Sequence, residues 1–210
     1  MRFPGNRLRD FEVRVEVGEQ RAILWPFPRD GERAVFDRGP VRIETDSGEI
    51  VSERSEPRAA FNGLSGLRRN LRWDPLDVAY FAGYAIWNYL TTPYLLTWDR
   101  LDVTEGPEWR EGDETWRRLE VAFPPDLHTH STEQSFYVDQ RGLIRRHDYT
   151  AEPVGGWARG VHLMDEHREF DGLVFPTRRR VRPRGPGGRA LSGPILVALD
   201  VLEVGVETGS

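Results

Sequence analysis

The fold is decided by the stretch Asp74-Pro75-Leu76-Asp77-Val78-Ala79-Tyr80-Phe81-Ala82-Gly83-Tyr84-Ala85-Ile86-Trp87-Asn88-Tyr89-Leu90. It predicts a helix over 74–91, because Asp74 suits the N-cap, Pro75 suits the first helical position and Pro93 prevents much continuation. The stretch is apolar nearly all round, so we expect neighbours on most of its sides. A sheet that curves around the helix would supply them.

Strand patterns lie on both sides of this helix. Before it, residues 11–17 alternate apolar and charged, and 41–45 and 49–51 flank the turn Asp46-Ser47-Gly48, which indicates a hairpin. After it come seven strand candidates, at 94–104, 115–123, 128–138, 143–151, 156–168, 173–184 and 194–206. Short turns between them favour an antiparallel meander. We therefore predict a mainly β fold: one domain, 1–210, with a curved antiparallel sheet or half-barrel wrapped around one buried helix.

The composition removes several classes of chemistry. The chain has 210 residues, a formal charge of −5 and no Cys, and all 29 basic residues are Arg. Thiol nucleophiles, Cys-ligated metals and lysine Schiff bases are excluded, and we expect no cofactor. The acidic balance argues against nucleic acid as a partner. The N-terminus has no apolar signal region and no stretch is long enough to span a membrane, so we expect a cytoplasmic protein.

Strands, one buried helix and then about seven strands form an order that resembles the half-barrel of the bacterial lipoprotein-carrier (LolA-type) family. That resemblance implies a curved antiparallel sheet around a helix, over an apolar cavity. The segments Gly-Leu-Ile-Arg-Arg-His-Asp-Tyr (142–149) and Pro-Thr-Arg-Arg-Arg-Val (176–181) are similar to an uncharacterised family of small bacterial proteins. This second resemblance implies no known activity.

All five His lie between positions 128 and 167. With four-residue turns, strand parity places His147 opposite Gln134 on one side and opposite Gly160 on the other, where a small residue leaves room for a ligand. We expect this face to be the concave, helix-facing side. Its chemistry-bearing members are His128, His130, Gln134, Phe136, Arg145, His147, Tyr149, His162 and Arg179. The opposite face, with Arg146, Asp148, Arg178, Arg180 and Arg182, is expected to face solvent.

One face of the helix carries aromatic residues at helical spacing: Tyr80, Tyr84 and Trp87, followed by Thr91. They are either ordinary core or the wall of a pocket for a flat apolar molecule. In the pocket interpretation, Tyr84 and Trp87 lie across a cavity from Phe136 and His147.

These patterns lead to one main functional hypothesis: a cofactor-independent acid–base enzyme, an isomerase or cyclase of specialised metabolism acting on a hydrophobic small molecule. His147 would be the general acid/base, His130 its partner and Tyr149 the donor to an oxyanion. The ligand-binding residues would be Tyr84, Trp87, Gln134, Phe136, Arg145, His162 and Arg179.

Two alternatives remain open. The first is a non-catalytic carrier or binder of a lipophilic ligand in the same cavity. The second is a metal enzyme in which His130, His147 and either His128 or His162 bind zinc or iron.

The arginines add two expectations. The arginine run from 178 to 184 is either a solvated edge or a surface for an acidic carrier protein. Arg179 faces inward and needs a buried anion, from a ligand or from an acid such as Glu120.

Overall fold

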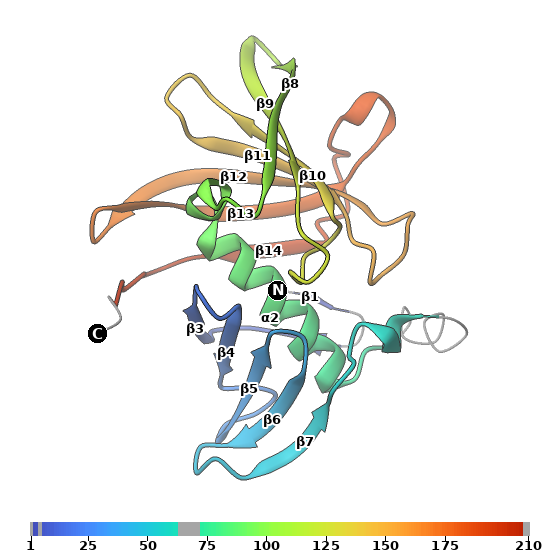
Figure 1. Cartoon of the computed structure of the whole chain (residues 1–210), viewed down its shortest axis with the longest axis vertical. Helices are drawn as coiled ribbons and strands as arrows, with labels where there is room; N and C mark the ends of the chain where they lie inside the picture. The colour runs from blue at the N-terminus through green and yellow to red at the C-terminus, as the bar shows by residue number, and fades with distance from the viewer. Residues whose placement is uncertain (1, 4–5, 63–71, 208–210) are drawn as a thin grey trace.

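The computed structural model describes residues 2–3, 6–62 and 72–207. The predicted fold class is confirmed: the chain is mainly β, with curved antiparallel sheets around one long helix, α2 (Pro75–Thr91). The predicted single sheet is in fact two sheets, and α2 lies between them (Figure 1).

Both main sheets are meanders, in which each strand pairs with its neighbours along the chain. The first has the order β3-β4-β5-β6-β7. Its strands are β3 (Glu12–Glu16), β4 (Arg21–Trp25), β5 (Glu32–Asp37), β6 (Val41–Thr45) and β7 (Ile50–Arg54). The second has the order β14-β13-β12-β11-β10-β9-β8. Its strands are β8 (Asp102–Glu111), β9 (Glu114–Ala122), β10 (Glu133–Val138), β11 (Ile144–Thr150), β12 (Arg159–Phe170), β13 (Leu173–Pro183) and β14 (Val197–Asp200).

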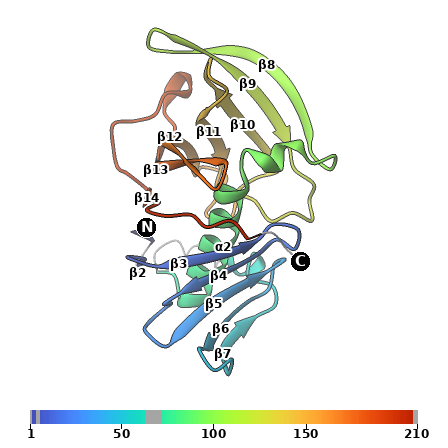
Figure 2. The same cartoon turned by 90° about the vertical axis from the view of Figure 1, so that its left-hand side faces the viewer.

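Short elements complete the described chain. A two-stranded ladder joins β1 (Arg2–Phe3) and β2 (Asn6–Arg7), and the short 3-10 turns are η1 (Ala59–Phe61), η2 (Tyr94–Thr97) and η3 (Pro186–Gly188). Figure 2 shows the segment after β14 running alongside β3, where Arg14 and Glu207 form an exposed ion pair of 2.9 Å. No helix in the described ranges is both long and apolar enough to cross a membrane.

The predicted start of the helix is confirmed. Asp74 is the N-cap and accepts a hydrogen bond from the backbone N–H of Asp77, whose side chain accepts one from the N–H of Asp74 in return. This reciprocal cap satisfies two backbone donors that would otherwise lack partners. Arg54 of β7 donates to the buried carboxylate of Asp77 at 2.7 Å, which ties the first sheet to the helix.

The helix packs differently against the two sheets. Its backbone lies close to β4, β5 and β6, and within the described residues no strand of the seven-stranded sheet approaches it comparably. Gly83 makes the close contact: a Cβ built there would lie 2.4 Å from the Cβ of Phe36 on β5. Toward the seven-stranded sheet, large side chains fill the space. This second layer contains most of the residues that the sequence singled out.

Three predicted strands have the wrong bounds, and the last of them, at 194–206, is the short strand β14 (Val197–Asp200). The candidate at 94–104 is the 3-10 turn η2 followed by a strand that begins only at 102, and Leu95 packs into the core. The candidate at 128–138 begins at 133. Hydroxyls compete with strand pairing there: Thr129 donates to the carbonyl of Ser131, which donates to that of Glu133. His128 and His130 therefore lie in a loop.

Candidate functional site

The layer between α2 and the seven-stranded sheet is built around His130. Tyr84 and Tyr89 of α2 place their hydroxyls 3.1 Å from the Nδ1 and Nε2 of this imidazole respectively. The hydroxyl of Tyr89 also lies 3.1 Å from that of Tyr149 on β11. We call the buried set Tyr84, Tyr89, His130, Phe136, His147, Tyr149 and His162 the aromatic layer. It joins one face of the helix to three strands and one loop.

His147 lies at the centre of the sheet side of this layer. Its ring is stacked on Phe136, with 4.1 Å between ring centroids, and its Nε2 lies 2.5 Å from the amide oxygen of Gln134. An amide oxygen only accepts, so the ring carries its proton on Nε2. The amide nitrogen of Gln134 in turn donates to the carbonyl of Ser131. The imidazole is thus fixed by the strand beside it.

Burial sets the charge state of the layer. It lowers the pKa of His130 to about 3, and lowers the pKa of His147 and His162 well below the ordinary value of 6.5. It raises the pKa of Tyr89 to about 12. Desolvation disfavours the charged form in each case. At neutral pH the imidazoles and phenols of the layer are therefore uncharged.

His162 and Arg179 complete the layer at the side of β12 and β13. The ring of His162 packs on Tyr89 with 4.4 Å between centroids, and the guanidinium of Arg179 lies over the same tyrosine at 5.4 Å. Arg179 donates to the backbone carbonyl of Tyr89 at 2.6 Å. Sequence reasoning placed His162 and Arg179 on this face but missed Tyr89. The sequence analysis singled out the stripe of Tyr80, Tyr84 and Trp87. Because the helix is apolar all round, no pattern indicated that Tyr89 faces the same sheet as the histidines.

The predicted faces are confirmed for most site residues, although the partners differ. His147 pairs with Phe136 and with His162, where the sequence predicted Gln134 and Gly160. Each register differs from the predicted one by two residues, which preserves the face of each side chain. Gly160 faces Tyr149 instead, and a Cβ built on it would lie 3.2 Å from that ring. The expected free space at Gly160 is therefore occupied.

Two predicted ligand-binding residues lie outside the layer. A bulge leaves Arg145 as an extra residue in β11, and its guanidinium pairs with Asp165 at 2.8 Å rather than facing the helix. Trp87 is fully buried, as expected, but its indole N–H donates to the carbonyl of Glu16 on β3. It faces the five-stranded sheet and not His147, so the predicted pocket between Trp87 and His147 does not exist.

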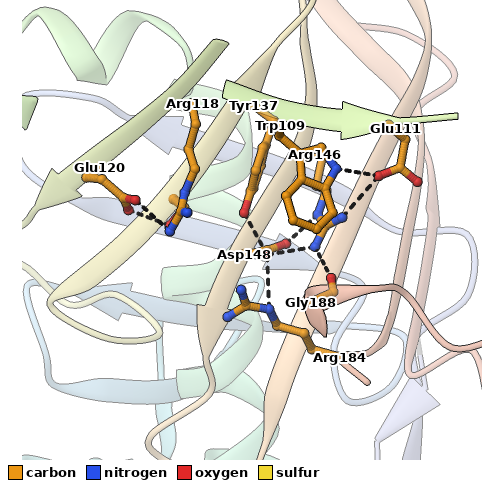
Figure 3. Close-up of polar contacts among 10 residues, drawn as sticks. Trp109, Glu111, Arg118, Glu120, Tyr137, Arg146, Asp148, Arg184 and Gly188 are labelled. Atoms are coloured by element: carbon orange, nitrogen blue, oxygen red, sulfur yellow. Dashed lines mark hydrogen bonds and ion pairs between the residues drawn. The ribbon is translucent and has the colours of Figure 1, made fainter. Parts of the chain in front are cut away.

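The prediction that Arg146 and Asp148 face solvent is wrong. Both are buried on the other face of the seven-stranded sheet, and Arg146 donates to Asp148 through Nε at 2.7 Å (Figure 3). The guanidinium lies over the rings of Trp109 and Tyr137, at 4.5 and 4.8 Å. The curled end of β8 brings in Trp109 and covers the pair. Strand alternation could not reveal this, because the cover comes from distant parts of the chain.

Other charged groups near this face also have partners. Arg146 bonds to Glu111 and to the carbonyl of Gly188, which precedes Arg189 in the turn after β13 (Figure 3). Glu120, once a candidate partner for Arg179, pairs with Arg118 and accepts from Ser135. Glu120 thus belongs to the outer face.

Two depressions on the described surface lie away from the aromatic layer. One, of about 470 Å³, lies between β5–β7 and the start of α2, lined by residues such as Pro28, Ile43 and Leu76. The other, of about 330 Å³, lies between the start of β9, around Thr115, and the turn between β10 and β11, around Asp139. Among the described residues no group of three or more His, Asp or Glu is placed to hold a metal ion. The proposed His-ligated metal centre has no geometric support.

No model of a known protein family matches the chain, and no curated protein matches it. Among solved structures, a DUF1329 family protein from Desulfovibrio piger is similar over 82% of this chain and 68% of its own, at 13% identity and a TM-score of 0.44. A LolA superfamily protein from Nitrosomonas europaea is similar over 85% and 70%, at 13% identity and a TM-score of 0.47. A Vibrio parahaemolyticus domain assigned to outer-membrane lipoprotein sorting covers 77% and 63%, at 8% identity and a TM-score of 0.40.

The observed architecture, antiparallel sheets around one buried helix, agrees with the resemblance to the lipoprotein-carrier half-barrel at the level of the fold, whereas the burial of the histidines corrects the functional prediction. The hypothesis of an acid–base isomerase or cyclase of specialised metabolism is wrong. A general acid or base needs a pKa near the working pH and contact with its substrate. His147 and His130 have strongly lowered pKa values, and both side chains are buried among their neighbours.

Proposed function

We propose that this protein is a non-catalytic binder or carrier of a lipophilic small molecule, held between α2 and the seven-stranded sheet. One observation carries the proposal: the helix backbone packs closely on the five-stranded sheet, whereas only side chains bridge it to the seven-stranded sheet. Side chains change rotamer more easily than packed backbones separate. A ligand would enter by displacing part of the aromatic layer.

The chemistry of the layer suits such a ligand. Ligand sites for small molecules are mostly apolar and aromatic, with a few polar groups that fix orientation. Phe136 and Met164 supply apolar surface here, and Tyr84, Tyr89 and His147 supply neutral hydrogen-bonding groups. The arrangement therefore offers contact area without requiring the ligand to pair with several charges.

Location and protein partners stay predictions. A cytoplasmic location rests on the sequence alone. An acidic carrier protein as partner is less favoured, because Arg178 pairs with Glu166 and Arg180 pairs with Asp200 on the outer face of β13. These arginines already have carboxylates beside them.

The test is photo-crosslinking with 1-hexadecanol that carries a diazirine. The chain has no Lys, so trypsin cleaves it only after Arg and separates α2 (73–100) from the β11 and β12 peptides 147–159 and 160–168. We expect saturable labelling of these three peptides that unlabelled 1-hexadecanol competes away. Labelling confined to residues around Pro28 and Leu76, or no saturable labelling, would contradict the proposal.

A further inference from the structure

Resting on this proposed function, we propose that Arg179 and His162 form the subsite for the head group of the ligand, and that this head group carries a single negative charge. A carboxylate and a phosphodiester share that chemistry. The ligand would thus be an anionic amphiphile, with its aliphatic part in the aromatic layer.

Arg179 is a buried cation without a buried anion. Its side chain is 1% exposed, and within the described chain no carboxylate pairs with it. Its NH2 donates to the carbonyl of Tyr89 and its NH1 lies 3.7 Å from the sulfur of Met164, whereas its Nε has no hydrogen-bond partner among residues 2–3, 6–62 and 72–207. Burying a charge without compensation is costly, so such a group calls for a partner.

His162 is a second buried polar side chain beside Arg179. Its side chain is fully buried, and neither ring nitrogen has a hydrogen-bond partner in the part of the chain that the structure describes. The pairing of Met164 with Arg179 and of His162 with Val181 places both side chains on one face of adjacent strands. Both pack on the ring of Tyr89. The free N–H of Arg179 and a ring nitrogen of His162 therefore converge on one region.

A second buried arginine, Arg146, provides a comparison within the same chain. Arg146 is equally buried, and it donates to Asp148, Glu111 and the carbonyl of Gly188. Among the described residues, the guanidinium of Arg179 contacts a carbonyl and a thioether in place of such anions. The two arginines differ in that Arg146 contacts carboxylates, whereas Arg179 does not. A bound ligand could supply the negative charge for Arg179.

Charge balance limits the kind of head group. Arg179 is the one buried cation of this layer in the described chain, because burial keeps the neighbouring imidazoles neutral. One negative charge balances it. A phosphate monoester with two charges would leave one charge buried without compensation. Arg179 also pairs with Leu199 of the edge strand β14, which places an aliphatic residue next to the subsite.

The test compares three probes below their critical micelle concentrations by isothermal titration: hexadecanoate, lysophosphatidylglycerol and neutral 1-hexadecanol. We expect the wild-type protein to bind at least one of the anionic probes about 30-fold or more tightly than 1-hexadecanol, the factor that corresponds to a buried charged pair. Arg179→Met should abolish this preference. The matched control is Arg178→Met, the exposed neighbour on the other face, which should keep the preference.

Each outcome decides a separate point. If all three probes bind wild-type protein equally, or if Arg179→Met retains the preference, the anionic subsite is refuted while lipophilic binding stands. If no probe binds, the proposed function fails as well. Should Arg179→Met not fold, His162→Phe keeps the ring volume and should reduce the preference by about tenfold, the worth of one hydrogen bond to a charged group. An unchanged preference in that variant would also refute the subsite.

Discussion

The phenol ring of Tyr149 lies parallel to the imidazole of His130, with 3.9 Å between ring centroids and 7° between ring planes. The two residues come from a strand and a loop that the helix residue Tyr89 links through hydrogen bonds to both. A stack this close leaves no room for a substrate between them. His130, which the sequence proposed as the partner of the general acid/base, and Tyr149, proposed as the oxyanion donor, instead hold the helix to the sheet.

Stability should fall as the pH falls from 7 to 5. The folded-state pKa values of His130, His147 and His162 are lowered by burial, whereas the unfolded chain has a value of about 6.5. The unfolded state therefore binds more protons below pH 6.5, and the free energy of unfolding decreases by about 1.4 kcal/mol per pH unit for each buried imidazole. Urea denaturation at several pH values measures the slope.

Replacing one of these imidazoles provides the control for the pH effect. His147→Phe should reduce the slope between pH 5 and 7 by about one imidazole's share, since carboxylates hardly titrate in that range. A slope equal to that of the wild type would mean that His147 is not buried in its neutral form.

Gly83→Ala should destabilise the protein, although alanine is the better helix former by about 1 kcal/mol. The new Cβ would overlap Phe36, and overpacking of a core costs about 1–3 kcal/mol. Chemical denaturation gives the difference. Gly18→Ala is the control, because a Cβ there meets nothing within 4 Å. A stabilised Gly83→Ala variant would mean that the helix is not pressed against β5.

Asp148→Asn should cost about 3 kcal/mol or more of unfolding free energy, because it removes the main anionic partner of the buried guanidinium of Arg146. The comparison is Glu105→Gln, which breaks an exposed pair with Arg117 on the neighbouring strands. That change should be too small to measure. Equal effects of the two substitutions would argue that the cluster around Arg146 is hydrated in solution.

Trp87→Phe should lower stability without affecting ligand binding. The substitution leaves the carbonyl of Glu16 without its donor, at a cost of about 1–3 kcal/mol. Because Trp87 faces the five-stranded sheet, the crosslinking of hexadecanol to the β11 and β12 peptides should persist. Loss of that labelling in a folded Trp87→Phe variant would contradict the proposed site, because it would mean that the ligand binds on the side of α2 that faces the five-stranded sheet.

The sequence alone determined the helix and the alternation of the strands. Asp74 and Pro75 encode the start of the helix locally, through a cap and a fixed backbone angle. Alternation has a period of two, so it assigned His147, His162 and Tyr149 to one face even where each partner was wrong by two residues. Local chemistry and short-range periodicity are readable without knowledge of the fold.

Only the tertiary structure decided which side chains meet across the layers. An all-round apolar helix does not show which of its faces contacts which sheet. In the structure, Trp87 contacts the five-stranded sheet, whereas Tyr89 lies on the side of the seven-stranded sheet. A strand pattern likewise does not show that β8 curls back to bury Arg146 and Asp148. Burial by distant segments depends on packing of the whole chain. For the same reason, the sequence showed five histidines in one region, and the fold made three of them, His130, His147 and His162, neutral core residues. They lie near Arg179, which pairs with no carboxylate among the described residues.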